Sequence, residues 1–280
     1  MPTPELGFVR LPDGLRLRYR QMPADGPTVL LLHGWPQTGH AWRRILPTLA
    51  ASGYLPLAPD MRGCGDSDKP TGGYDAVSRM EDARALVAAL GLGDEPIFVA
   101  GHGDEGAEAA LAYAAQHPAE VAGIAAVSAI PQIRGGAQGW HGGFHQIPDL
   151  PETLIGPNLE AYLRHFFRAW SHDPDMLPEA DLAVYVRALS APGALRASLA
   201  PFRVPTPATA LVVSPIPLLL LLGESDPSLD MQAAKDFVGS YGGAARLELV
   251  ARGGHWLPEE RPDPVAAALL TFFRAQTRIV

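Results

Sequence analysis

The chain has 280 residues, of which 47% are hydrophobic and 19% are charged, a composition typical of globular rather than disordered proteins. Its 22 Lys and Arg and 30 Asp and Glu give a net charge of −8, which weighs against nucleic acid or an anionic membrane as a partner. The single cysteine, Cys64, cannot form an internal disulfide. The N-terminal residues lack the pattern of a secretory signal, and no apolar run could span a membrane. We therefore expect a cytoplasmic protein.

The first predicted elements form a hairpin, because 8–11 and 15–20 flank a Pro-Asp-Gly turn. Strand and helix patterns then alternate along the chain, which predicts right-handed βαβ units and a mostly parallel sheet. The predicted strands are 28–32, 54–58, 97–100, 121–128, 218–222 and 246–250, and the predicted helices are 41–51, 74–90, 106–116, 230–241 and 263–276.

The alternation stops after Ile130 and resumes at residue 218. The residues between are rich in Trp, His, Phe and Tyr and contain no convincing strand pattern. We predict a core made of residues 1–130 and 215–280, with a helical lid domain at 131–214. A lid beside the carboxyl ends of parallel strands would cover the crevice in which such sheets bind ligands.

Asp104 lies in the sequence GHGDEG, between a predicted strand and a predicted helix. A turn with the pattern small–x–nucleophile–x–small presents one reactive side chain at a helix N-terminus. Centred on Asp104, the pattern has His102 and Gly106 at its small positions; centred on Gly103, it has no reactive side chain. The distance to the following His117-Pro118 also favours Asp104. The alternative is an ordinary aspartate in a glycine-rich turn.

Two further polar residues follow predicted strands. Asp226 lies in GESDPS, and His255 lies in ARGGHW before the last helix. Each alone would be an ordinary turn or packing residue. Together with Asp104 they give the chain order nucleophile, acid, base, in which the acid orients the imidazole and stabilises its protonated form.

In these residues the chain resembles the α/β-hydrolase superfamily, and in particular its epoxide hydrolase branch. The matching stretches are His33-Gly34-Trp35-Pro36, DMRGCGDS at 60–67, the turn at Asp104, GESD, GGHWLPEERP and the lid sequences WHGGFHQIPDLPE and YVRALSAPGALRASL. The resemblance covers nearly the whole length and implies an α/β-hydrolase fold with helices on both faces of the sheet and an inserted lid.

The resemblance also implies a mechanism. An aspartate nucleophile attacks an sp³ carbon and forms an alkyl ester, which water activated by His255 and Asp226 then hydrolyses. The backbone N–H groups of Trp35 and Glu105 would stabilise the oxyanion. We expect the substrate pocket to include His33, Pro36, Trp140, Phe202 and Trp256.

An epoxide oxygen also needs a proton donor, which relatives in this branch usually supply from two lid tyrosines. Here the second tyrosine position holds Phe202, before Arg203, and the first holds His141. Tyr185 and Tyr162 are the other candidates, with packing on an amphipathic helix as the alternative for each.

The predicted function is therefore cofactor-independent hydrolysis of a small apolar epoxide by water, giving a vicinal diol. A dehalogenase, an esterase and a catalytically silent ligand-binding relative are the alternatives. Glu105 follows the predicted nucleophile, where dehalogenases carry Trp or Arg, and a carboxylate would repel halide. The sequence contains no HExxH or CxxC metal motif and no nucleotide-binding motif. Both a monomer and a homodimer fit these observations.

Overall fold

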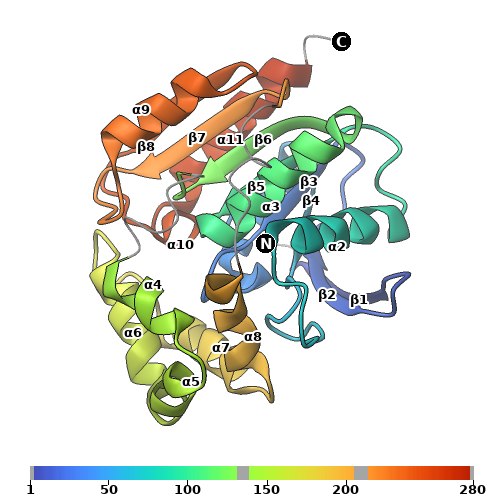
Figure 1. Cartoon of the computed structure of the whole chain (residues 1–280). Coiled ribbons are helices and arrows are strands. Elements are labelled where there is room, and N and C mark those ends of the chain that lie inside the picture. Colours follow the sequence, from blue (N-terminus) through green and yellow to red (C-terminus); the bar gives the residue numbers. More distant parts are fainter. Residues whose placement is uncertain (1–2, 131–138, 205–213, 278–280) are drawn as a thin grey trace.

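The computed structural model describes residues 3–130, 139–204 and 214–277. At its centre lies one eight-stranded sheet with the strand order β1-β2-β4-β3-β5-β6-β7-β8 (Figure 1). The pairs β1–β2 and β2–β4 are antiparallel, and the other neighbouring strands run parallel. The strands are β1 (Glu5–Arg10), β2 (Arg16–Gln21), β3 (Thr28–Leu32), β4 (Leu55–Pro59), β5 (Ile97–His102), β6 (Val121–Val127), β7 (Leu218–Gly223) and β8 (Ala245–Val250).

Helices cover both faces of the sheet, as expected for parallel strands joined by helical crossovers. Apolar residues of α2, α3 and α9 pack on one face, and those of α1 and α11 pack on the other. The helices of the core are η1 (Gly39–Trp42), α1 (Leu46–Ala51), α2 (Ala76–Ala89), α3 (Gly103–Gln116), η2 (Pro118–Glu120), α9 (Met231–Ser240), α10 (Leu257–Glu260) and α11 (Pro262–Thr277), where η marks a 3₁₀ helix.

The strand β3 shows how one strand contributes side chains to the apolar clusters on both faces of the sheet. Its residues are all buried, and successive side chains of a strand point to opposite faces. Leu30 and Leu32 therefore enter the cluster under α2 and α3, whereas Val29 and Leu31 enter the cluster under α1 and α11. A continuous apolar run is thus the pattern required of a strand covered on both faces.

Between β6 and β7 the described residues form only helices, which Figure 1 shows grouped beyond one end of the sheet. Their apolar faces make a separate cluster that includes Leu163, Phe166 and Leu182, and Trp256 of the core packs into it. These helices are α4 (Gly139–Gln146), α5 (Leu150–Ile155), η3 (Gly156–Asn158), α6 (Leu159–Ala169), α7 (Glu179–Ser190), α8 (Ala194–Leu199) and η4 (Ala200–Arg203).

The six predicted strands that follow the hairpin are confirmed to within two residues at their ends, and the predicted hairpin is formed by β1 and β2, with β1 beginning three residues before the predicted start. The single helix predicted at 41–51 is wrong, because the structure divides it into η1 and α1. The helix predicted from residue 106 begins at Gly103. The predicted start of the lid at residue 131 lies outside the described residues, as do residues 205–213 near its predicted end. No helix among those described has the length and apolar character needed to cross a membrane.

Candidate active site

The turn from β5 into α3 is built on glycines. A Cβ atom at Gly101 would lie 2.1 Å from the carbonyl oxygen of Gly106, so the strand and the helix approach each other where neither has a side chain. Gly103 has φ +61°, a conformation that glycine adopts without the steric penalty of a Cβ atom. The left-handed position of the turn is therefore Gly103. The predicted centre of the turn, Asp104, therefore shifts by one residue to Gly103.

Asp104 follows in the first turn of α3 and lines a cavity between the sheet and the lid helices. A carboxylate at this position is stabilised by the N-terminus of the helix. Its charge also acts on His255, which lines the same cavity. The structure thus brings the predicted nucleophile and the predicted base to one site.

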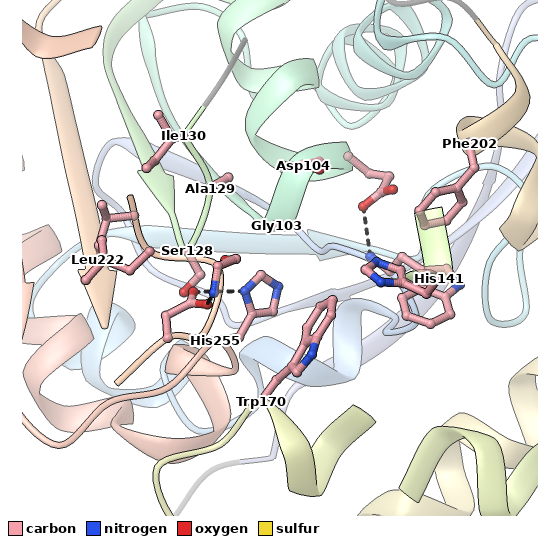
Figure 2. A pocket seen from close by; sticks show the side chains of 15 residues that line it. Gly103, Asp104, Ser128, Ala129, Ile130, His141, Trp170, Phe202, Leu222 and His255 are labelled. Atoms are coloured by element: carbon pink, nitrogen blue, oxygen red, sulfur yellow. Dashed lines mark hydrogen bonds and ion pairs between the residues drawn. The ribbon is translucent and has the colours of Figure 1, made fainter. Parts of the chain in front are cut away.

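His255 and Asp226 form a hydrogen-bonded pair at the ends of β8 and β7. Nδ1 of His255 lies 2.9 Å from Oδ2 of Asp226, and a carboxylate can only accept, so Nδ1 carries the proton and Nε2 can take one up. The other carboxylate oxygen accepts hydrogen bonds from the backbone and the hydroxyl of Ser228, at 2.9 and 2.6 Å. Figure 2 shows His255 in the cavity with Ser128 and with Leu222 of β7.

The pair is electrostatically coupled. Burial favours neutral His255, but the charge and hydrogen bond of Asp226, with smaller contributions from Asp104 and Glu105, raise the pKa of His255 above its ordinary value. Burial likewise favours the neutral form of Asp226, yet His255 and Ser228 lower the pKa of this carboxyl. Asp226 is therefore an anion that stabilises a protonated His255.

His102 supports this pair from behind the turn. Its side chain is fully buried, and its Nε2–H donates a 2.9 Å hydrogen bond to the backbone carbonyl of His255. Burial, and then the charge of His255, lower the pKa of His102 to about 3. A neutral imidazole at residue 102 thus fills the place for which the sequence pattern predicted a small residue.

The backbone N–H of Glu105 was predicted to help form the oxyanion site, but the structure places the side chain of Glu105 there. Its Oε2 atom accepts a 3.0 Å hydrogen bond from the backbone N–H of Trp35. Beyond Glu105 lies a second cavity, which His33 and Pro36 line together with Trp35. His33 is fixed there, because its Nε2 accepts the backbone N–H of Met61 at 3.1 Å. His33 and Pro36 therefore flank the first cavity rather than line it.

Of the predicted lid residues, His141 and Phe202 line the first cavity (Figure 2). Burial, and then the charge of His255, lower the pKa of His141 to about 4, whereas the Glu105 carboxylate acts in the opposite direction. His141 is therefore a neutral imidazole near pH 7 and can donate one N–H.

Four other predicted residues lie outside the lining of this cavity. Tyr185 is fully buried, and its hydroxyl donates to Glu259. The hydroxyl of Tyr162 lies 2.7 Å from Nε2 of His145. Trp140 is 60% exposed, and Trp256 is fully buried with its indole N–H on the carbonyl of Phe166.

The sequence interpretation missed several residues that line the cavity. Trp170 contacts His255 in two ways, because its ring packs edge-on at 5.0 Å between centroids and its carbonyl accepts the His255 N–H at 2.7 Å. Ser128 and Leu222 lie at the ends of β6 and β7, a position that could have identified them. Within the described ranges, no three His, Cys, Asp or Glu side chains gather as a metal site would require.

Comparisons with known proteins agree with this fold. The family model for the alpha/beta hydrolase fold matches residues 27–262. A soluble epoxide hydrolase of Corynebacterium sp. (strain C12) is 31% identical, with 93% of this chain and 94% of that protein covered. The solved epoxide hydrolase CorEH, without ligand, superposes with a TM-score of 0.86 at 30% identity, over 97% of this chain and 99% of that chain.

Another relative carries a different name. A haloalkane dehalogenase of Mycobacterium marinum (strain ATCC BAA-535 / M) is 32% identical, with 81% of this chain and 69% of that protein covered. Similarity at this level spans both enzyme classes, so the fold alone does not choose between them. The two epoxide hydrolases match over more than nine tenths of both chains, whereas the dehalogenase is covered over 69% of its length. The chain belongs to the α/β-hydrolase family, in its epoxide hydrolase branch.

Proposed function

We propose that this protein hydrolyses epoxides to vicinal diols through an alkyl ester on a carboxylate of the turn after β5. One observation carries the proposal: the His255–Asp226 pair, bonded at 2.9 Å, lines one cavity with two carboxylate residues, Asp104 and Glu105. This is the set of groups that a covalent, two-step hydrolysis needs. The full-length similarity to named epoxide hydrolases supports the choice of substrate class.

In the first step, a carboxylate oxygen attacks an epoxide carbon, and the carbon–oxygen bond of the ring breaks. The sequence assigns this attack to Asp104, and that assignment stays a prediction. The released alkoxide takes a proton, for which His141 is the cavity-lining lid donor with a pKa lowered to about 4. A neutral imidazole is a weak acid, so strained or aryl epoxides would suit this site.

In the second step, His255 takes a proton from water, and the resulting hydroxide attacks the ester carbonyl. Asp226 stabilises the imidazolium through its hydrogen bond to Nδ1. Collapse of the tetrahedral intermediate releases the diol alkoxide, which takes the proton from His255. The proton left on the reformed carboxyl group returns through water to His141. The sum of both steps is epoxide plus water giving diol, with the enzyme unchanged.

The cavity favours epoxides over halides. A leaving halide would meet a charged carboxylate of the turn, because only one of Asp104 and Glu105 can be neutralised as the ester. Two anions in this position repel each other. A neutral epoxide carries no such penalty in the ground state, and aromatic residues such as Trp170 and Phe202 provide apolar contact surface.

The proposal is tested by measuring diol release from a panel of aryl and alkyl epoxides, with His255→Gln beside the wild-type enzyme. We expect diol from wild type and a decrease of about 10²- to 10⁴-fold in the variant, because general-base catalysis is lost. Halide release from haloalkanes in place of diol from epoxides would overturn the proposal.

A further inference from the structure

A side chain at the left-handed position of the turn would enter the cavity, but that position holds Gly103. Apart from the neighbouring backbone of α3, a Cβ atom built on Gly103 would have two neighbours within 4 Å among the described residues: the Cα atom of Gly34, at 3.2 Å, and the Oε2 atom of Glu105, at 4.0 Å. The Glu105 carboxylate therefore lies over the place from which a side chain at residue 103 would start. Residue 105 is 8% exposed, so this arrangement is enclosed.

The Glu105 carboxylate makes the contact that is expected of a carboxylate that forms an ester. Such a group uses one oxygen for attack, and its other oxygen becomes the oxyanion when water adds to the ester. Oε2 of Glu105 already accepts the Trp35 N–H at 3.0 Å, the amide predicted to hold that oxyanion. In this arrangement Oε1 is the oxygen that would attack the epoxide carbon.

Electrostatics also places Glu105 among the groups that the reaction uses. Its negative charge raises the pKa of His255 and opposes the lowering of the pKa of His141. The base and the lid donor thus both respond to this one carboxylate. A side chain with two methylene groups can reach back over the glycine from the first turn of α3, whereas Asp104 is one methylene shorter.

We infer that Glu105, seated on the Trp35 amide above Gly103, is the carboxylate that forms the covalent ester. This inference rests on the proposed epoxide hydrolysis and names the residue that carries it out. Oε1 of Glu105 bonds to the epoxide carbon while the ring carbon–oxygen bond breaks, and the alkoxide is protonated by His141. Hydroxide formed at His255 then adds to the Glu105 carbonyl carbon, and the charge develops on Oε2.

The ester can be located directly. In the His255→Gln variant the second step is slow, so incubation with styrene oxide leads to accumulation of an adduct with the added mass of the whole epoxide. Fragmentation of the peptide that contains both residues separates Asp104 from Glu105. We expect the added mass on Glu105. An adduct on Asp104 would overturn the inference and leave the proposed function intact.

Substitutions provide a second test. Glu105→Gln retains the side-chain length and an acceptor for the Trp35 N–H, but an amide is a poor nucleophile. We expect its diol formation to fall at least about 10³-fold, further than in Asp104→Asn. Glu160→Gln on the exposed face of α6 is the control, with turnover expected to equal that of wild type. A larger loss in Asp104→Asn would contradict the inference, and no diol from wild type would contradict the proposed function itself.

Discussion

The Nε2–H of His102 donates a 2.9 Å hydrogen bond to the backbone carbonyl of His255, which ties the last residue of β5 to the proposed base. His102 directly precedes Gly103, so the bond joins the turn that carries the carboxylates to the loop that carries the imidazole. The two halves of the site are thereby held at a fixed separation by a fully buried group.

Removing this bond should lower both stability and turnover. His102→Leu leaves a buried carbonyl without its donor, which costs about 1–3 kcal/mol of the free energy of unfolding. We also expect a lower kcat, because the His255 loop loses its connection to β5. Urea denaturation and diol release measure the two effects. A variant with wild-type kcat would show that His102 has no positioning role.

The coupling of Asp226 to His255 determines the pH dependence of turnover. Water activation requires neutral His255, and the pKa of this residue is raised above its ordinary value, mainly by Asp226 against the effect of burial. The rate should therefore rise with pH through a midpoint above about 6.5. In Asp226→Asn, burial acts without the compensating charge, so the midpoint should move to lower pH while the maximal rate falls. A pH–rate profile with an unchanged midpoint would contradict this coupling.

Acid should destabilise the fold through its buried neutral histidines. Burial lowers the pKa of His102 and of His145 to about 3, whereas the unfolded chain takes up these protons near pH 6.5. Below about pH 6.5 the unfolded state binds more protons, so stability falls as the pH falls, by about 2 kcal/mol for each histidine between about pH 7 and pH 5.

This loss can be measured by urea denaturation at both pH values. His145→Phe removes one of the titrating groups from a fully buried position, so its loss on acidification should be smaller by about 2 kcal/mol. An equal loss in the variant and in wild type would rule out His145 as a contributor.

The lid substitutions should separate catalysis from packing. His141→Phe removes the N–H in the cavity and should abolish diol formation with little loss of stability. Tyr185→Phe removes a buried hydroxyl that donates to Glu259 outside the cavity lining, so it should lower the free energy of unfolding by about 1–3 kcal/mol and preserve turnover. Diol release and thermal unfolding of both variants check this; full turnover in His141→Phe would reject His141 as the donor.

The parallel strands could be predicted because their pattern is decisive. A run of apolar residues such as 28–32 fits only a strand covered on both faces, and the residues that follow such strands collect at one edge of the sheet. This is why Asp226 and His255 could be paired before the fold was known. Their 2.9 Å bond agrees with that expectation.

The register of the turn could not be predicted, because each register places a glycine at only one of the two small positions: Gly106 when the turn is centred on Asp104, and Gly101 when it is centred on Gly103. Only the backbone shows that Gly103 takes the left-handed conformation. The direction in which each lid side chain points could not be predicted from the sequence either. Tyr185 and His141 both lie on short helices, and the packing of those helices on the core decides which of them meets the cavity.

The most direct test of covalent hydrolysis is a single turnover in water labelled with heavy oxygen, with enzyme in excess over styrene oxide. If a carboxylate attacks the epoxide, the oxygen added to the first diol comes from the protein, so that diol should be unlabelled and the label should remain in the enzyme. Heavy oxygen in the diol of the first turnover would show direct attack by water and contradict the account.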